Sequence, residues 1–370
     1  MSFESGVERL VRPELLAMEG YAAVEPMEVL SQYAGIPVEE VVKLDGNENP
    51  YGPSPRVGPA LASYPYYHIY PDPTHRQLRR ALEGYVGLDA SHLVVGSGSD
   101  ELIDLIMRLF LRPGDGVINC PPTFPIYPFK ANVCGGRLLE VPRDTSHGLD
   151  FAGVKRACQE GAKLIFLASP NNPTGNVVPE AQVRELLETG IVVVVDEAYY
   201  EFSGITVAPL VPHFHNLIVL RSFSKWAGLA GLRVGYGVFP PKLAELIMKI
   251  KLPYNVNIAA QVAALESLAD LEYLQGTIKA LVAERSRLFA KLGELGFLKP
   301  YPSQANFILC DVTGKEAKSL HRGLRERGIF IRYYDTPLLR NCLRVSVGKP
   351  EHTDALIAAL KEVGAENDRA

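Results

Sequence analysis

Three short apolar runs decide the fold: KLIFLA at residues 163–168, IVVVV at 191–195 and LIVL at 217–220. Continuous aliphatic and β-branched runs are typical of strands that are buried on both faces, as in a parallel sheet covered by helices. Similar runs lie at 116–119 and 233–239, with helical patterns or loops between them. The sequence therefore predicts an α/β domain with a mainly parallel sheet sandwiched by helices.

The rest of the chain predicts a second, smaller unit. Beyond about residue 262, a long helical pattern with little punctuation leads into a short alternation of strands and helices, which is typical of an α+β domain. The first residues mix short helical patches with turn signals. We expect an N-terminal arm and part of the small domain over 1–50, a large domain over 51–265 and a small C-terminal domain over 266–370.

Composition excludes several classes of function. The net charge of -4 provides no global positive field to attract nucleic acid or an anionic bilayer. No run approaches the roughly 20 apolar residues needed to span a membrane. The five cysteines contain no CxxC pair, and the HxH pattern of His213 and His215 has no evident third ligand, so we expect reduced thiols and no metal site. These features predict a cytoplasmic protein without nucleic-acid or membrane partners.

Unusual chemistry follows each of the three decisive runs. SPNNPTG follows the first, DEAY the second and RSFSK the third. Ligands of an open parallel sheet bind beyond the carboxyl ends of its strands. Asn172 precedes Asp196 by 24 residues and Asp196 precedes Lys225 by 29 residues, each about one βαβ step. We therefore expect these three side chains to converge.

The residue types at these ends indicate carbonyl chemistry on an aromatic ring. A desolvated Lys225 amine is a nucleophile that forms a Schiff base, although a helix-capping lysine or one paired with Asp196 is the alternative. Asp196 is either a buried ion-pair partner or a carboxylate that keeps a pyridine ring protonated as an electron sink. Tyr199 and Asn172 suit a ring phenolate. Phe124 either stacks on the ring or belongs to the core.

A glycine-rich loop predicts a phosphate site. GSGSDE at 96–101 lies between a strand and an apolar helix, so backbone amides and the positive helix end point to one place. Helix capping by Ser99 or Asp100 is the alternative. Glu101 occupies the third glycine position of a dinucleotide fingerprint, which excludes that motif. Hydroxyl donors and a guanidinium suited to a phosphate dianion lie further along the chain: Ser222, Ser224 and Arg233.

Nine motifs, in family order over about residues 42–360, carry a family resemblance. SPNNPTG, DEAYYEF and SFSKWAGLAGLRVGYG resemble the fold type I, class II pyridoxal-phosphate aminotransferases. Six more narrow the resemblance to the histidinol-phosphate aminotransferase group: LDGNENPYGPSP, YPDP, GSGSDE, PPTF, SQANFIL and CLRVSVG. The resemblance implies that pyridoxal 5′-phosphate binds to the large domain, and that an amino group passes from L-histidinol phosphate to 2-oxoglutarate in histidine biosynthesis.

The resemblance also implies roles for matching residues. Lys225 bonds to the cofactor and then moves the proton between substrate Cα and cofactor C4′. Asp196 holds the pyridinium nitrogen, and Tyr199 with Asn172 the phenolate oxygen. Phe124 takes the ring-stacking position, where relatives often carry tyrosine. The cofactor phosphate is bound by the amides of Ser99 and Asp100 and by the side chains of Ser222, Ser224 and Arg233.

Substrate recognition requires a site for both a carboxylate and a phosphate. A guanidinium binds either anion through paired donors. Arg344 in CLRVSVG stands where relatives bind the substrate anion, and Arg332 in IFIRYY is a second candidate, with a surface ion pair as the alternative. Asn49 and Asn306 are expected rim contacts, with turn formation as the alternative for Asn49.

An aromatic segment predicts an interface. Tyr70 in YPDP matches the tyrosine that relatives reach across the dimer to the cofactor phosphate, so the resemblance implies an obligate homodimer with shared sites. The segment 64–70 contains four tyrosines and a histidine, which suits interface packing or the imidazole end of the substrate pocket. Rival functions are an aromatic aminotransferase or phosphothreonine decarboxylase of the same fold, or a non-catalytic protein that binds a phosphate ligand.

Overall fold

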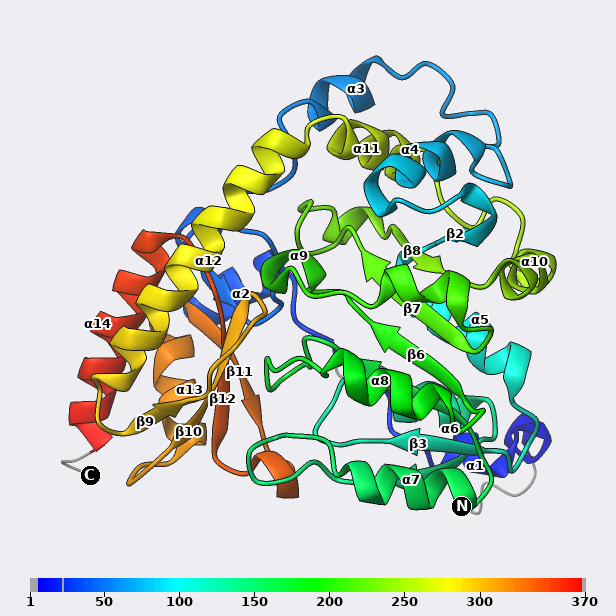
Figure 1. Cartoon of the computed structure of the whole chain (residues 1–370). Coiled ribbons are helices and arrows are strands. Elements are labelled where there is room, and N and C mark those ends of the chain that lie inside the picture. Colours follow the sequence, from blue (N-terminus) through cyan, green and yellow to red (C-terminus); the bar gives the residue numbers. More distant parts are fainter. Residues whose placement is uncertain (1–5, 22, 368–370) are drawn as a thin grey trace.

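A seven-stranded sheet lies at the centre of the larger part of the molecule (Figure 1). The computed structural model describes residues 6–21 and 23–367. The sheet has the order β2-β8-β7-β6-β5-β3-β4, and only β8 runs antiparallel to its neighbours. The mainly parallel α/β sheet is therefore confirmed. Its strands are β2 (Leu93–Gly96), β3 (Gly116–Asn119), β4 (Arg137–Glu140), β5 (Ala162–Ala168), β6 (Val192–Asp196), β7 (Leu217–Ser222) and β8 (Gly235–Val238).

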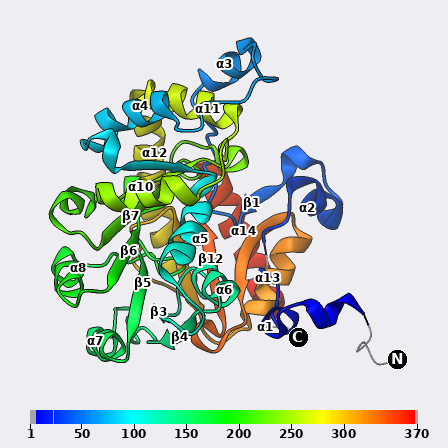
Figure 2. The ribbon, with the colours of Figure 1, turned by 90° about the vertical axis from the view of Figure 1, so that its right-hand side faces the viewer.

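Helices cover both faces of this sheet, which explains the continuous apolar runs. In β5, Ile165 faces one layer and Phe166 the other, and both are buried. Figure 2 shows α7 and α8 on one side and α5 and α6 on the other. Because successive side chains of a strand alternate between faces, a strand covered twice must be apolar at every position. The covering helices are α5 (Gly98–Phe110), α6 (Ile126–Val133), α7 (Phe151–Gln159), α8 (Glu180–Leu187) and α10 (Pro241–Ile250).

A second sheet joins the N-terminal segment to the C-terminal part. It has the order β1-β11-β12-β10-β9, in which only β1 and β11 pair in parallel. The predicted second α+β unit, built from part of the N-terminal segment and from the C-terminal part, is present, while the boundaries near residues 50 and 265 stay predictions. Its elements are β1 (Val42–Leu44), β9 (Leu298–Pro300), β10 (Phe307–Val312), α13 (Ala317–Glu326), β11 (Ile329–Tyr334), β12 (Cys342–Ser346) and α14 (Pro350–Asn367).

The long helical pattern beyond residue 262 forms two helices, α11 and α12. The break follows Ala269, and Asp270 has a non-helical backbone with φ -130° and ψ 44°. Its carboxylate accepts a hydrogen bond from the Ser54 hydroxyl, a long-range contact that no local pattern reveals. The helices outside the sheet layers are α1 (Pro13–Leu16), α2 (Met27–Ala34), α3 (Val57–Ser63), α4 (Arg76–Val86), α9 (Tyr200–Ser203), α11 (Ile258–Leu268) and α12 (Leu271–Gly293).

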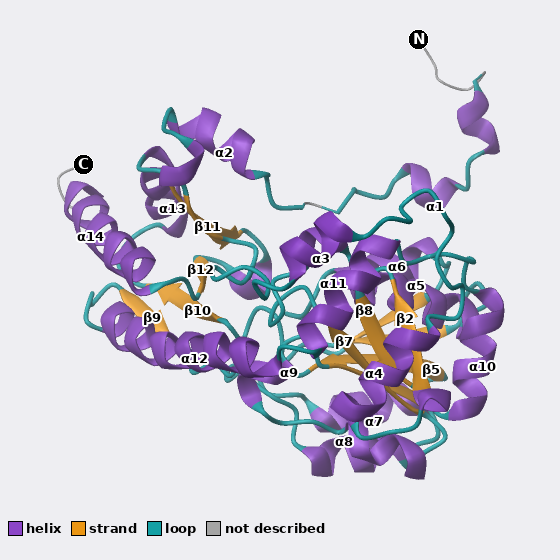
Figure 3. Cartoon of the chain, turned by 90° about the horizontal axis from the view of Figure 1, so that it is seen from above, coloured by secondary structure: helices purple, strands orange, loops and turns teal. Residues whose placement is uncertain are grey.

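The N-terminal segment runs from α1, beside the larger part of the molecule, to α2, beside the smaller part, as Figure 3 shows from above. The Arg12 guanidinium donates to the Val133 carbonyl at the end of α6, 2.5 Å away. Leu30 of α2 packs against Phe330 of the smaller sheet. The chain between α1 and α2 therefore passes over the region where the sheets meet. No helix within the described ranges is long and apolar enough to cross a membrane, and the cytoplasmic location stays a prediction.

Candidate active site

The carboxyl ends of three parallel strands lie side by side. Asp196, the last residue of β6, pairs in register with Ala168 of β5 and with Leu220 of β7. Asn172 lies four residues beyond Ala168, and Lys225 five beyond Leu220. Because β5, β6 and β7 are neighbours in the sheet, the segments that carry these residues start from the same edge.

The Lys225 amine lies inside the protein and not in bulk water. Its Nζ donates to the Gly46 carbonyl at 2.8 Å, rather than pairing with Asp196 as the alternative required. Burial lowers the pKa of this amine from 10.5 to about 8; the Glu48 carboxylate opposes the shift and the Arg344 guanidinium adds to it. A larger fraction of the amine is therefore neutral, and nucleophilic, near neutral pH.

Asp196 is a buried carboxylate, 4% exposed. Its Oδ2 accepts from the Tyr127 hydroxyl at 2.8 Å and its Oδ1 from the Ala198 amide at 3.1 Å. Burial raises the pKa of Asp196 to about 6, and the hydrogen bond from Tyr127 works against this rise. No cationic side chain forms an ion pair with it within residues 6–21 and 23–367. Tyr127 was not among the predicted site residues.

Tyr199 and Asn172 are bound by groups from the other sheet and the N-terminal segment. Asn47 donates to the Tyr199 hydroxyl at 3.0 Å, and Phe307 packs edge-on against the ring at 5.1 Å between centroids. Burial raises the pKa of Tyr199 to about 12, so its hydroxyl stays protonated at neutral pH. The Asn172 Oδ1 accepts from Arg344 at 2.6 Å, which leaves the Asn172 amide nitrogen as the donor.

The loop before α5 has the shape of a phosphate site. Gly98 has φ +74°, and a Cβ there would lie 2.6 Å from a guanidinium nitrogen of Arg233. The helix begins without a side-chain cap from Ser97, and Asp100 pairs with Arg233 at 2.9 Å. Capping by Ser99 or Asp100, the alternative interpretation of this loop, is not what the helix uses, and the guanidinium lies directly over the glycine turn.

Arg233 is held in a strained backbone conformation beside two serines. Its φ is +55°, in the left-handed region that side chains rarely occupy, and such strain clusters at binding sites. Its Nη1 donates to the Ser224 hydroxyl at 3.4 Å and to the Ala230 carbonyl at 3.2 Å. The Ser222 hydroxyl accepts from the Ser224 amide at 3.1 Å. The structure thus brings these predicted phosphate ligands together.

Two arginines stand opposite each other on adjacent strands. Arg344 of β12 pairs in register with Arg332 of β11, so their side chains leave the same face. Arg344 is 6% exposed; it donates to Asn172 and to the Asp45 carbonyl, and its Nε has no partner in the described protein. Like charges directly opposite each other are destabilising. An anion bound between or beside them would remove that penalty.

The two predicted rim asparagines bind backbone groups of the site. Asn49 donates to the Trp226 carbonyl, next to Lys225, at 2.9 Å. Asn306 donates to the Asn47 carbonyl at 2.9 Å and is fully buried. These bonds hold the N-terminal segment against the lysine loop. Contact of either asparagine with substrate stays a prediction.

An aromatic cluster extends from the sheet to the N-terminal segment. Phe124 lies edge-on to Tyr127, with centroids 5.6 Å apart, and edge-on to Tyr21 at 6.5 Å. Burial raises the pKa of Tyr21, and the nearby Arg332 guanidinium opposes the rise. Tyr21, Asn47 and Tyr127 were not predicted from the sequence as site residues. Tyr127 follows Phe124 by three residues, a helical spacing that could have revealed it.

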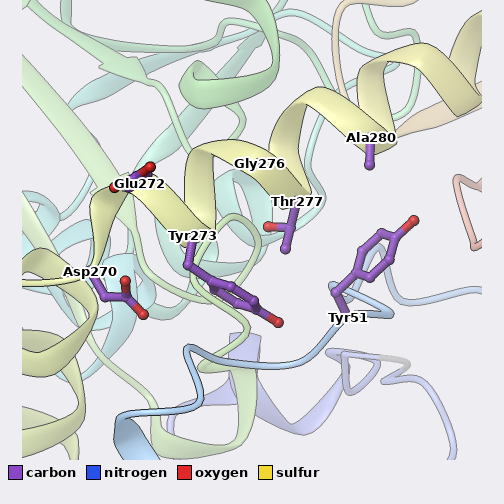
Figure 4. Close-up of a pocket in the computed structure, with 7 residues that line it drawn as sticks. All are labelled: Tyr51, Asp270, Glu272, Tyr273, Gly276, Thr277 and Ala280. Carbon is purple, nitrogen blue, oxygen red and sulfur yellow. The ribbon is translucent and has the colours of Figure 1, made fainter.

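Tyr70 lies on the surface, 79% exposed, and stacks on Tyr254 at 4.6 Å between centroids. Its predicted contact with a phosphate in a second subunit stays a prediction. A separate hollow of about 530 Å³ lies beside the start of α12, with Tyr51 and Tyr273 on two of its sides (Figure 4). No predicted site residue lines it. The lining residues are Tyr51, Asp270, Glu272, Tyr273, Gly276, Thr277 and Ala280.

Comparison with known proteins assigns the family. The model of the family described as aminotransferase class I and II matches residues 39–360. The chain belongs to this aminotransferase family. A histidinol-phosphate aminotransferase of Dehalococcoides mccartyi is 47% identical over 97% of this chain and 99% of its own length. The chloroplastic histidinol-phosphate aminotransferase 1 of Arabidopsis thaliana is 49% identical over 96% of this chain and 86% of its own.

A solved aminotransferase structure has the same architecture. The histidinol-phosphate aminotransferase of Sinorhizobium meliloti, in complex with pyridoxal-5′-phosphate, superposes with a TM-score of 0.88 at 29% identity, covering 98% of this chain and 99% of that one. The resemblance carried by the nine sequence motifs, and the fold type I architecture that it implied, are confirmed.

Proposed function

We propose that the protein is a pyridoxal-phosphate-dependent aminotransferase of histidine biosynthesis. It transfers the amino group of L-histidinol phosphate to 2-oxoglutarate, which yields imidazole acetol phosphate and L-glutamate. The observation that carries this proposal is the desolvated Lys225 amine, close enough to Arg344 for that charge to lower its pKa, on the loop after the strand that pairs with Asp196. The relatives' names and their identity of 47–49% over nearly the whole chain support the particular substrates.

The residues of the crevice fit the cofactor. Arg233 lies over the Gly98 turn beside Ser224, a set of donors that suits a phosphate dianion. The buried Asp196 carboxylate has no cationic partner among the described residues, as a site for a protonated ring nitrogen requires. When bound, pyridoxal 5′-phosphate supplies an aldehyde carbon and a ring that takes up electrons from the substrate. Asp196 would keep the ring nitrogen protonated. Tyr199 and the Asn172 amide would donate hydrogen bonds to the phenolate oxygen.

Lys225 performs the proton transfer. Its amine would hold the cofactor aldehyde, and as a free amine it would move a proton between the substrate Cα and the cofactor C4′. The lowered pKa of about 8 favours this role, because an amine whose pKa lies near physiological pH can both accept and donate a proton there. The Gly46 carbonyl, 2.8 Å away, holds the released amine near the crevice.

Arg344 and Arg332 serve both half-reactions. Glutamate brings carboxylates and histidinol phosphate brings a phosphate, and paired guanidinium donors accommodate either shape. Their register across β11 and β12 places the two side chains on one face of the sheet, and Tyr21 lies near enough for both charges to oppose the rise of its pKa. One anion site therefore serves two substrates in turn, as the alternation of the two half-reactions requires.

The functional unit is a homodimer in which Tyr70 reaches the phosphate site of the second subunit. Contiguous exposed apolar side chains mark interaction surfaces, and Tyr70 belongs to such a group. Tyr70 is 79% exposed, and its ring contact is with Tyr254, so its hydroxyl is available to a partner subunit. The exposed side chains of this group are Tyr66, Tyr67, Ile69, Tyr70, Leu252 and Tyr254.

Steady-state turnover tests the substrate assignment. The purified protein is supplied with 2-oxoglutarate and, in turn, L-histidinol phosphate, an aromatic amino acid or phosphothreonine, and glutamate formation and carbon dioxide release are followed. We expect the highest kcat/KM with L-histidinol phosphate. Turnover of an aromatic amino acid without histidinol phosphate, or decarboxylation of phosphothreonine, contradicts the proposal. A colourless protein that takes up no pyridoxal phosphate contradicts the whole family of assignments.

A further inference from the structure

Tyr127 combines two contacts at the centre of the crevice. Its hydroxyl donates to Asp196 Oδ2 at 2.8 Å, and the residue is only 2% exposed. Its ring stacks on Phe166 of β5, with centroids 5.0 Å apart and planes 16° apart, and meets Phe124 edge-on at 87°. The hydroxyl cannot swing away from the carboxylate without disturbing the packing on two sides of its ring.

Asp196 needs help to stay ionised. It is buried, it forms no ion pair with any cationic side chain in the described part of the chain, and the carboxylates of Glu197 and Asp100 add repulsion. Burial raises its pKa to about 6, whereas hydrogen bonds to its charged form lower it. The donors that it has are the Ala198 amide and the Tyr127 hydroxyl.

The hydroxyl is a constant donor. Burial raises the pKa of Tyr127 well above 10.0, and the adjacent Asp196 charge raises it further, so the proton stays on the tyrosine throughout the pH range in which the carboxyl titrates. A carboxylate offers about four lone-pair directions. Two are used by Tyr127 and Ala198, and the orientation of the remaining ones is thereby fixed.

We propose that Tyr127 is a positioning residue that keeps Asp196 ionised and aimed at the ring nitrogen of the cofactor, while its ring supports Phe124 against the face of the same cofactor. This inference rests on the proposed cofactor site. It assigns to one side chain the alignment of both the edge and the face of the bound ring.

The test measures cofactor affinity against pH. Trp226, the single tryptophan of the chain, follows Lys225, so its fluorescence reports pyridoxal phosphate at the site. A Lys225→Ala parent binds without a covalent bond, which makes the equilibrium reversible. In this parent, Tyr127→Phe is expected to raise the pKa of Asp196 by about one unit, because a donor to the charged form is lost. The dissociation constant then rises about fivefold at pH 6 and changes less than twofold at pH 8.

Tyr301→Phe is the matched control. It also removes a hydrogen bond from a tyrosine hydroxyl to an aspartate, Asp311, at 2.5 Å, but outside the crevice. We expect no change in cofactor affinity at either pH. Melting temperatures of all variants establish that each is folded, and Tyr127→Phe is expected to fold because it keeps the stacking ring.

A double-mutant cycle separates positioning from general support of the fold. In the Asp196→Asn background, the proposal predicts that Tyr127→Phe changes cofactor affinity by the same factor at pH 6 as at pH 8. Equal weakening at both pH values, unchanged affinity, or a pH effect that persists in the Asp196→Asn background would overturn it. If the Lys225→Ala parent itself binds no pyridoxal phosphate, the proposed function fails instead.

Discussion

The two sides of the crevice are built in different ways. On the cofactor side, the seven-stranded sheet places Asp196 by its register between Ala168 and Leu220. On the substrate side, the segment 45–49 is inserted between the two sheets and held by single bonds from distant residues, such as the Ser346 hydroxyl that accepts from the Asn47 amide at 2.9 Å. One side is thus fixed within a single sheet, whereas the other depends on how several segments dock. Substitutions on the cofactor side should mainly lower kcat, and substitutions on the substrate side should mainly raise KM.

The largest effect is expected at Lys225. Lys225→Ala removes both the amine that bonds the cofactor and the group that moves the proton, so turnover should fall at least several hundredfold while the cofactor still binds. Lys242→Ala, an exposed lysine on α10, is the control and should leave turnover unchanged. Steady-state rates and the visible spectrum check both. A Lys225→Ala protein with normal turnover would place the chemistry elsewhere.

The second-largest effect is expected at Arg344, on the substrate side. Arg344→Ala should raise KM for L-histidinol phosphate and for glutamate together, by about a hundredfold, because a buried guanidinium that binds both anions is lost. The kcat of Arg344→Ala should fall much less than the kcat of Lys225→Ala. Arg344→Lys keeps a charge but not the paired donors, and should recover only part of the affinity.

The outcome of the Arg344 experiment also distinguishes one anion site from two. KM values for both substrates are measured in the same preparation, with Arg332→Ala in parallel. A rise for only one substrate would contradict a shared site. Because Arg344 also holds Asn172, a fall in cofactor affinity alongside the KM change would show that the two sides of the crevice are less independent than their construction indicates.

The same difference explains what sequence could and could not predict. Lys225, Asp196 and Asn172 follow apolar strands, so local pattern plus the rule for parallel sheets was enough to place them together. Tyr127 lies 69 residues from Asp196, and Asn47 152 residues from Tyr199, so these contacts depend on tertiary packing. The roles assigned to Arg344 and Tyr70 came from family resemblance alone, because no spacing rule links them to the strand ends.

A pH experiment probes the cofactor side by itself. Only the neutral Lys225 amine attacks the cofactor aldehyde, and its pKa is lowered to about 8. The rate of cofactor capture by the apoprotein should rise about fivefold from pH 7 to pH 8 and less than twofold from pH 8 to pH 9. Stopped-flow absorbance measures it, and the rate with a small primary amine corrects for ionisation of the cofactor. A rate that still rises about eightfold from pH 9 to pH 10 would indicate an ordinary lysine with a pKa of 10.5.

The smallest effect concerns a third contributor, the second subunit. Tyr70→Phe removes one hydroxyl, and loss of one hydrogen bond to phosphate should weaken cofactor binding about three- to tenfold. In homodimers this cannot reveal which subunit supplies the tyrosine. Mixed dimers can reveal it. In a chain with Lys225→Ala the site loses its yellow absorbance, so the absorbance reports cofactor binding at the other site alone.

Two mixed dimers give opposite expectations. When Tyr70→Phe and Lys225→Ala stand on different chains, the reporting site receives an intact Tyr70 from its partner, and its affinity should be that of the unaltered protein. When both changes stand on one chain and the other is unaltered, the reporting site receives the phenylalanine and should bind three- to tenfold more weakly. The reverse pattern would assign Tyr70 to the phosphate site of its own chain. Equal affinities in both mixed dimers would remove Tyr70 from the phosphate site and leave it as an interface residue.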